Sequence, residues 1–467
     1  MKDAFPAHTL PPGPRGWPIL GMLPAIRRDP VGVFMQGALR FGDVVYFRIG
    51  PRRGYLLTNP EDVRHVLQDN ARNYHKSPLY DKLRLFLGNG LLTSEDDLWL
   101  RQRRIAQPAF HRQRMMALAG VMAEAARDVS ARWQPFASAG HPVDVDEEMM
   151  RLTRTVVVRA LLGADLGPFT STIDQAWAIV NQHVGESFWS LGFADGWPTR
   201  KNRRFQAARA VLRGAVDHVI TERRRNPSDS ADLLSMLMSA RDEETGEAMT
   251  DEQLRVEVTT FLLAGQETTS LALTWTWYLL SQNPRARQRL EDELDVVLDG
   301  RPPEYPDLAN LPYLRMVIDE AMRLYPPAWG FSRQALADDR LGGFLLPRGW
   351  LAFVIPYVLH RLPAFWTDPD AFDPERFSPE RSADRPKFAY IPFGAGPRQC
   401  IGNQFALIET QLIVATLAQA YRLQLVPRHR AEPWPLITLR PRYGMPMIIE
   451  RRTPARRPSQ PAADPRR

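Results

Sequence analysis

Cysteine is nearly absent from this sequence, since Cys400 is the only one among 467 residues. A lone thiol excludes an intrachain disulfide and a zinc site built from several cysteines. The opening residues 1–23 lack a long apolar run and contain five prolines. This composition excludes a signal peptide or membrane anchor of ordinary form. The sequence therefore predicts a cytoplasmic protein without a membrane anchor.

Excess positive charge is missing from most of the chain, although the net charge is +7. Residues 451–467 hold six arginines and one aspartate, so +5 of that charge lies in this short segment. A nucleic-acid-binding surface typically has a basic stripe with interleaved aromatic residues. No such stripe occurs elsewhere in the sequence. We expect residues 1–9 to form an N-terminal arm and residues 451–467 a disordered tail rich in arginine and proline. A protein that binds nucleic acid or an anionic surface through this tail is the weakest of the functions considered.

The pattern of apolar residues predicts a mainly α chain with a smaller β-rich part. Val44–Ile49 and Gly54–Thr58 are short β-branched and aromatic runs separated by a turn, which predicts a hairpin. The longest helix is expected over Asp251–Ser281, and because it is apolar on nearly all faces it should lie inside the core. Further helices are expected over Leu314–Leu324 and Ile401–Ala420.

The lone cysteine ends a glycine-rich loop, Phe393-Gly-Ala-Gly-Pro-Arg398-Gln-Cys400-Ile-Gly402. At the start of a helix, unpaired N–H groups and the positive end of the helix dipole stabilise a thiolate. The loop resembles the haem-binding signature of the cytochrome P450 family at every fixed position. The resemblance implies that Cys400 is the axial thiolate of haem b iron, that Phe393 packs over the sulfur, and that Arg398 holds a haem propionate. A thiolate ligand favours O–O cleavage.

The segment Ala264-Gly265-Gln266-Glu267-Thr268-Thr269 lies within the predicted buried helix, where a carboxylate and two threonines are unusual. Taken alone, it fits a helix-packing notch with back-bonded threonines equally well. It also resembles the acid–alcohol motif of the same family. The resemblance implies that Gly265 makes room for dioxygen and that Glu267 and Thr268 are the catalytic pair that delivers protons.

Two further arginine-containing motifs match the family in order and spacing. Trp99 and Arg103, four residues apart, resemble its tryptophan–arginine propionate clamp, and Arg333 occupies a further propionate position found in many members. The motifs that contain Glu320, Arg323 and Arg376 resemble a buried carboxylate–arginine network that supports the cysteine loop. We interpret these last three residues as structural and not catalytic.

The resemblance covers residues 10–450 and implies a single-domain cytochrome P450 fold, because motifs far apart in the sequence must meet on one cofactor. It implies a haem-thiolate monooxygenase that inserts one oxygen atom from O2 into a C–H bond. A peroxygenase driven by hydrogen peroxide is the alternative, disfavoured because members that use peroxide directly typically replace the Glu267–Thr268 pair. No flavin or iron–sulfur signature is present, so electrons should come from a separate donor, a ferredoxin with its reductase. We expect a monomer that binds no nucleic acid.

The resemblance places mostly apolar residues around the substrate, which predicts a lipophilic terpenoid, carotenoid or fatty acid. The expected pocket positions are Leu262, Leu263, Ala328, Trp329, Phe331, Leu436, Ile437 and the Ser77–Leu92 loop. The predicted docking face for the ferredoxin consists of four arginines near the cysteine side of the haem: Arg101, Arg104, Arg112 and Arg114.

Overall fold

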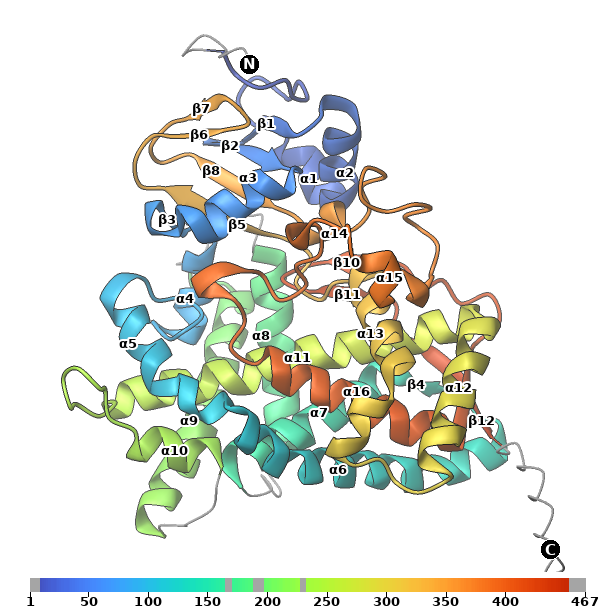
Figure 1. The fold of residues 1–467 in the computed structure, drawn as a ribbon. Helices are drawn as coiled ribbons and strands as arrows, with labels where there is room; N and C mark the ends of the chain where they lie inside the picture. Colours follow the sequence, from blue (N-terminus) through green and yellow to red (C-terminus); the bar gives the residue numbers. More distant parts are fainter. Residues whose placement is uncertain (1–8, 164–169, 188–196, 227–231, 453–467) are drawn as a thin grey trace, which may run out of the picture.

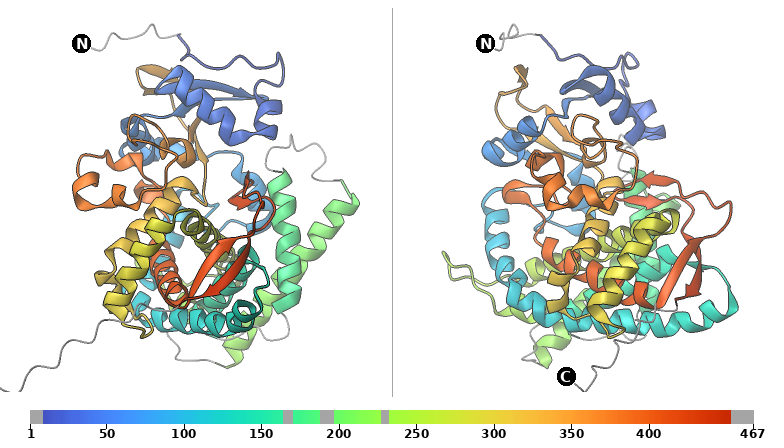
Figure 2. Two further views of the ribbon diagram at one scale, coloured as in Figure 1. Left: turned by 90° about the vertical axis from the view of Figure 1, so that its right-hand side faces the viewer. Right: turned by 45° about the vertical axis from the view of Figure 1, so that its right-hand side comes forward.

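The computed structural model describes residues 9–163, 170–187, 197–226 and 232–452. Figure 1 shows a large helical body below a smaller part that is rich in β-structure, and both views in Figure 2 keep this division. The predicted mainly α architecture is confirmed. Among the described residues, no helix is both long enough and apolar enough to cross a membrane.

Long helices form the body of the molecule. They are α6 (Arg112–Ala139), α7 (Val145–Leu162), α8 (Thr170–Ser187), α9 (Arg200–Arg225), α10 (Leu233–Ser239), α11 (Asp251–Gln282), α12 (Pro284–Leu298), α13 (Pro312–Leu324) and α16 (Asn403–Ala420). Shorter helices lie near the sheets and along the connecting segments. They are α1 (Leu23–Arg28), α2 (Pro30–Phe41), α3 (Pro60–Arg64), α4 (Tyr80–Leu87), α5 (Asp96–Ala106), α14 (Pro356–Leu359) and α15 (Pro379–Ser382).

The largest sheet has five strands in the order β1-β2-β8-β5-β3. Its strands are β1 (Val44–Ile49), β2 (Arg52–Leu57), β8 (Leu351–Val354), β5 (Phe331–Ala335) and β3 (Tyr74–Lys76). The predicted hairpin is confirmed as the antiparallel pair β1–β2, in which Val44 pairs with Leu57. In the antiparallel pair β3–β5, Lys76 at the end of β3 is the register partner of Arg333 in the middle of β5.

The remaining strands form three small sheets. They are β4 (Val143–Asp144), β12 (Pro446–Arg451) and β9 (Tyr421–Leu425) in one sheet, β6 (Asp339–Leu341) with β7 (Phe344–Leu346), and β10 (Pro433–Pro435) with β11 (Leu439–Pro441). The connection between β10 and β11 carries residues 436–438, which return to the central helix.

Helix α11 crosses the middle of the helical body, as Figure 1 shows. Thr250 Oγ1 accepts the Gln253 N–H and Gln253 Oε1 accepts the Thr250 N–H, so a capping box fixes its first turn. The helix ends just before Pro284, which cannot continue its hydrogen-bond ladder. Leu271 and Trp275 are fully buried, so the predicted central, buried helix is confirmed.

Two boundaries differ from those predicted. Helix α16 begins at Asn403, and Ile401 and Gly402 form a turn, so Cys400 precedes the helix and is not its first residue. At the other end, β12 runs to Arg451, and the buried Arg452 lies 2.5 Å from Asp295 Oδ2. The folded region therefore extends two residues beyond the expected limit at 450, while 453–467, the rest of the predicted tail, lies outside the described residues.

Candidate active site

A cavity of about 460 Å³ lies between the middle of α11 and the Cys400 loop. All eight predicted site residues line it: Trp99, Arg103, Glu267, Thr268, Arg333, Phe393, Arg398 and Cys400. They come from α5, α11, β5 and the loop before α16. The fold thus brings together residues that are up to 301 positions apart in the sequence.

The loop that carries Cys400 is closed by its own backbone. The Cys400 N–H donates to the Phe393 carbonyl at 3.0 Å. Gly396 has φ +68, and a Cβ there would lie 1.8 Å from the Leu67 carbonyl oxygen. A side chain at this position would be strained and would also collide with backbone. The glycine therefore lets the loop pack directly against the helical segment 65–69.

Two groups near Cys400, the Gly402 N–H and Arg103, act in the direction expected of a thiolate-stabilising site. Burial raises the pKa of the Cys400 thiol, and the Gly402 N–H and the nearby Arg103 oppose that rise without reversing it. The expectation that this loop favours a thiolate stays a prediction. Cys400 precedes α16 by three residues, and its side chain lines the cavity.

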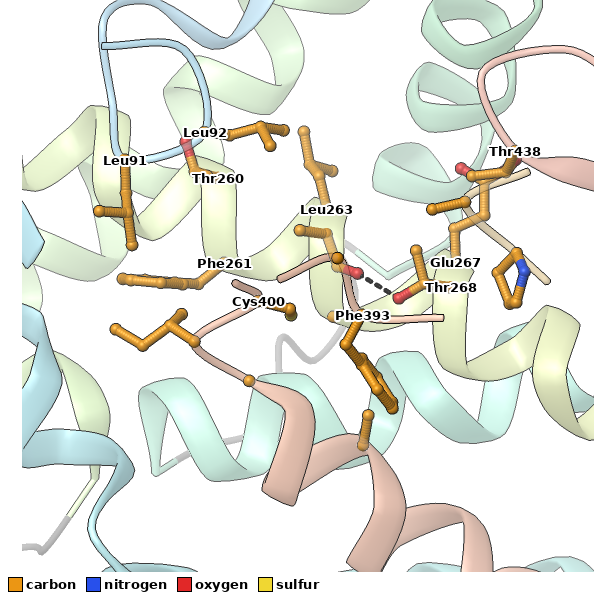
Figure 3. A pocket seen from close by; sticks show the side chains of 18 of the residues that line it. Leu91, Leu92, Thr260, Phe261, Leu263, Glu267, Thr268, Phe393, Cys400 and Thr438 are labelled. Carbon is orange, nitrogen blue, oxygen red and sulfur yellow. Dashed lines mark hydrogen bonds between the residues drawn. The ribbon is translucent and has the colours of Figure 1, made fainter. Parts of the chain in front are cut away.

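The acid and the alcohol of α11 have different partners. Thr268 Oγ1 donates to the Ala264 carbonyl at 2.6 Å, whereas Glu267 Oε1 accepts a hydrogen bond from Thr438 Oγ1 at 2.8 Å. Figure 3 shows the Glu267 side chain extending toward Thr438, while Thr268 lies closer to Cys400 and Phe393. A Cβ on Gly265 would approach Val157 Cγ2 to 3.2 Å. The segment therefore has features of both a packing notch and a cavity-facing acid–alcohol pair.

Arg398 is held by groups of the segment before α5 and by α5 itself. Its Nη1 donates to the Ser94 carbonyl at 3.0 Å and its Nη2 pairs with Glu95. The guanidinium carbon lies 3.8 Å from the centre of the Trp99 ring. Burial lowers the pKa of Arg398 to about 10, which leaves the side chain charged at neutral pH.

Three more basic side chains line the cavity: Lys76, Arg103 and Arg333. Arg103 Nη1 donates to the Gln399 carbonyl at 3.0 Å, and Lys76 Nζ donates to the same Ser94 carbonyl as Arg398, also at 3.0 Å. Within the described part of the chain, none of these three has a carboxylate at ion-pair distance. Arg103 and Arg333 thus place positive charge at the cavity wall.

The donors around the cavity fit haem b. A soft thiol faces the cavity from the Cys400 loop, and several cations provide partners for two propionate groups. Much of the remaining wall is apolar, as the porphyrin face requires: examples are Phe261, Leu263 and Phe393.

The predicted carboxylate–arginine network is confirmed. Arg323 donates to both oxygens of Glu320 at 2.6 and 2.8 Å, and Arg376 Nε lies 3.2 Å from Glu320 Oε1. Glu320 and Arg323 are fully buried. Both arginines also donate to backbone carbonyls of residues 360–371. This network fastens α13 to the irregular segment that leads into the Cys400 loop.

The predicted substrate pocket is correct for most positions. Leu263, Ala328, Trp329, Phe331 and Ile437 line the cavity, as do six residues of the 77–92 loop. Two positions are wrong. Leu262 lines a separate small cavity between α7, α9 and α11, because it lies on another face of α11. Leu436 does not line the main cavity either, and its side chain is the nearest neighbour of Gly185 on α8.

Sequence reasoning missed several polar residues near the site. Lys76 lines the cavity, and burial lowers the pKa of its amine to about 7. Glu257 is fully buried on α11 and accepts the Leu91 N–H at 3.0 and 3.1 Å. Thr438 and Arg440 contact Glu267. A single lysine, glutamate or arginine belongs to no motif with a fixed spacing, so the sequence does not mark it as a site residue. Glu257 could still have been noticed, because a glutamate is unusual in a helix predicted to lie in the core.

Two of the four arginines of the predicted docking face form ion pairs within the protein. Arg101 lies 3.2 Å from Glu247, and Arg104 lies 3.0 Å from Asp242 and 2.6 Å from Glu244. These two arginines hold the segment before α11 and do not form a free basic patch. The Arg112 side chain lies outside the described residues, and Arg114 is exposed.

Comparisons with known proteins agree with this geometry. The family model for cytochrome P450 matches residues 11–444. The chain is 40% identical to cyclooctatin synthase and 38% identical to cyclooctat-9-en-7-ol 5-monooxygenase, both from Streptomyces melanosporofaciens. The first alignment covers 92% of this chain and 93% of that protein, and the second covers 90% and 93%. The crystal structure of the cytochrome P450DA heme domain superposes with a TM-score of 0.86 at 30% identity, covering 95% of this chain and 98% of that chain. The chain therefore belongs to the cytochrome P450 family and is a haem-dependent monooxygenase that acts on lipophilic substrates.

Proposed function

We propose that this monooxygenase hydroxylates a C–H bond of a cyclic terpenoid, either a hydrocarbon or a simple alcohol. The observation that carries this proposal is the wall of the substrate end of the cavity, which is formed by apolar side chains from α4, α8, α11 and the segment after α13. The chain is also similar to cyclooctat-9-en-7-ol 5-monooxygenase, whose name denotes an unsaturated alcohol as substrate. This similarity supports the same class of substrate.

The fatty-acid alternative requires an anchor for a carboxylate, expected on an arginine or tyrosine between residues 72 and 92. Arg72 is exposed and Arg84 pairs with Asp81 at 2.7 Å, and neither lines the cavity. Tyr74 donates to Asp339 at 2.7 Å, which leaves Tyr80 as the member of this set that lines the cavity. A neutral phenol is a weak anchor for a carboxylate, so these contacts favour the terpenoid.

We assign the cofactor to the residues around the cavity. Cys400 Sγ would bind the iron, Phe393 would pack beside the sulfur, and Arg398, Trp99, Arg103 and Arg333 would hold the propionates. Bound haem supplies the reductive activation of O2, in which two electrons and two protons yield one water and leave one oxygen atom for the substrate. The thiol of this chain is compatible with that role, because it lines the cavity and coordination to a metal deprotonates a thiol outright.

The chain's own groups then perform three tasks. The apolar wall binds the substrate and excludes water from it. Gly265 leaves space beside α11, since it has no side chain to fill that part of the cavity. Thr268 and Glu267 hold and pass protons at their hydroxyl and carboxylate oxygens, because both line the cavity and Thr438 orients the Glu267 carboxylate.

Electrons are proposed to come from a ferredoxin and its reductase. Arg114 and Arg112 at the start of α6 are the candidate docking residues that remain after Arg101 and Arg104 are assigned to ion pairs. The Arg114→Glu substitution should slow reduction by an acidic ferredoxin, and the effect should shrink as salt rises. The cytoplasmic location and the monomeric state stay predictions from the sequence.

The test is a ligand screen read by the shift of the haem Soret band. Cyclic terpene hydrocarbons and alcohols should displace water from the iron, whereas a long-chain fatty acid and its methyl ester should bind weakly. Hits are then incubated with ferredoxin, reductase and NADPH, and hydroxylated products are identified by mass spectrometry. Tight binding of the fatty acid with loss of binding for its ester would overturn the terpenoid assignment.

A further inference from the structure

A buried group of charged side chains lies beside Glu267 and is contributed by separate segments. Glu267 is on α11, Arg440 is on β11, and Asp146 is in the first turn of α7. Arg440 Nε lies 3.7 Å from Glu267 Oε1, and Arg440 Nη2 lies 3.8 Å from Asp146 Oδ2. One guanidinium therefore lies between two carboxylates.

This group extends from the cavity toward solvent. Glu267 lines the cavity and its side chain is 6% exposed, the Asp146 side chain is 12% exposed, and the Arg440 side chain is 27% exposed. Arg440 is thus the member with access to bulk water. The group thus connects the more exposed Arg440 to Glu267 at the cavity.

The β10–β11 connection fixes Glu267 from two positions. Thr438 Oγ1 donates to the Glu267 oxygen that also faces Arg440. The strand itself is tied to α11, because Trp275 Nε1 donates to the Leu439 carbonyl at 2.8 Å. Figure 3 shows Thr438 directly beside the Glu267 side chain. Arg440 consequently approaches Glu267 in a geometry set by a buried hydrogen bond.

Resting on the proposed role of Glu267, we infer that Arg440 and Asp146 are positioning residues that hold the Glu267 carboxylate in the orientation in which it passes a proton into the cavity. The step involves one proton and no electrons. A solvent proton binds to the Glu267 carboxylate, Glu267 passes it into the cavity, and the carboxylate returns to its ionised form.

Asp146 is the second carboxylate beside Arg440 and helps to hold its guanidinium near Glu267. Burial raises the pKa of Asp146 to about 6, and the groups that face it are Arg440, Asp144, Glu267 and Thr274. Above that pH, the ionised Asp146 holds the Arg440 guanidinium beside Glu267. Below it, Asp146 is neutral and holds Arg440 less firmly, so Glu267 is less well positioned.

The experiment compares Arg440→Gln, Arg440→Lys and Asp146→Asn in the holoenzyme, with Arg442→Gln as matched control. Arg442 is two residues away and has its own ion pair with Glu432 at 2.8 Å, but it does not contact Glu267. The readouts are haem content, substrate affinity from the Soret shift, product formed per NADPH consumed, and the solvent isotope effect on product formation.

We expect Arg440→Gln to lower product per NADPH by about tenfold, less than the loss typical of removing a proton-transferring group itself. Arg440→Lys should restore much of the coupling, and Arg442→Gln should match wild type. Asp146→Asn should lower coupling at pH 7.5, because Arg440 loses its second carboxylate, and should abolish the fall in coupling that we expect for wild type as the pH drops through about 6. Haem content and substrate affinity should be unchanged, which a purely structural role would not produce.

Two outcomes separate this inference from the function on which it rests. Unchanged coupling in Glu267→Gln would overturn the catalytic role of Glu267. Lowered coupling in Glu267→Gln together with wild-type coupling in Arg440→Gln and Asp146→Asn would overturn the inference alone. In the Glu267→Gln background, Arg440→Gln should have no additional effect, and an additive loss would show that Arg440 acts elsewhere. If Arg440→Gln does not fold, the lysine and Asp146→Asn variants still decide the question.

Discussion

Arg398 lies with its guanidinium carbon 3.8 Å above the Trp99 ring while its Nη2 pairs with Glu95. The indole and the carboxylate restrict the guanidinium from two sides and so prepare its orientation before any anion binds. Because the group is already ordered, little further entropy is lost when it holds a propionate.

Trp99→Ala should therefore weaken haem binding by about tenfold, which corresponds to a cation–π contact of roughly 1–2 kcal/mol in a partly desolvated site. The rate of haem transfer to apomyoglobin measures this directly. Trp99→Phe keeps an aromatic face and serves as the control, so it should retain haem better than the alanine variant. Equal haem loss in wild type and Trp99→Ala would contradict the assigned clamp.

Cys400→Ser should yield a folded protein that lacks the red-shifted band of the reduced carbon monoxide complex. A serine oxygen cannot donate electron density to iron as a thiolate does. The optical spectrum of the reduced, carbon monoxide-treated protein is the measurement, and circular dichroism verifies folding. Retention of the band in the serine variant would disprove the ligand assignment.

Thr268→Ala should leave haem and substrate binding intact but divert electrons to hydrogen peroxide. The Thr268 hydroxyl donates to the Ala264 carbonyl at 2.6 Å, so its oxygen lone pairs can accept from a water in the cavity. Product per NADPH should fall and peroxide should rise. Thr276, a buried threonine on the same helix with the same kind of back-bond, gives the control variant Thr276→Ala. Equal coupling in Thr268→Ala and Thr276→Ala would show that Thr268 contributes only to helix packing.

Glu320→Gln should destabilise the protein by about 3–5 kcal/mol, because it leaves buried Arg323 and Arg376 without their shared carboxylate. Asp81→Asn breaks an exposed pair with the same i,i+3 spacing, Asp81–Arg84, and should cost only about 0–1 kcal/mol. Urea unfolding of both variants gives the comparison. A similar small loss in the two would show that the network does not anchor the segment before Cys400.

Much of the fold was predictable from local patterns. The hairpin and α11 follow from alternation, helical periodicity and proline or capping signals that act within a few residues. The cysteine loop and the acid–alcohol segment were found because several unusual residue types occur at fixed spacing. Those signals indicated which residues belong together, although no local pattern showed that Trp99 and Arg398 are stacked.

The remaining features depend on long-range contacts. The sequence predicted that Arg101 and Arg104 belong to a free basic face. Only the fold shows that acidic residues of the segment 242–247 lie opposite them. Leu262 and Leu263 are adjacent in sequence, but a rotation of 100° per residue around a helix places only Leu263 at the cavity. The hydrogen bond from Arg103 on α5 to the Gln399 carbonyl beside Cys400 is likewise a long-range contact that no loop motif encodes.

Glu257 gives a prediction about stability and pH. Its carboxyl group is fully buried and accepts the Leu91 N–H with both oxygens. Burial raises its pKa from 4.5 to about 7, and the Leu91 N–H and Lys76 only partly oppose that rise. Between these two pH values the folded protein binds a proton that the unfolded chain has released, so this residue's contribution to stability is lost as pH rises.

Glu257→Gln removes this titration while keeping an oxygen that can accept the Leu91 N–H. The unfolding free energy of the variant relative to wild type should rise by about 3 kcal/mol between pH 5 and pH 8. Lys76, whose pKa burial lowers from 10.5 to about 7, acts in the opposite direction above pH 7. Because Lys76 is present in both proteins, its contribution largely cancels in the comparison. Urea denaturation at pH 5, 6, 7 and 8 provides the data, and parallel stability curves would show that Glu257 titrates normally in the folded protein.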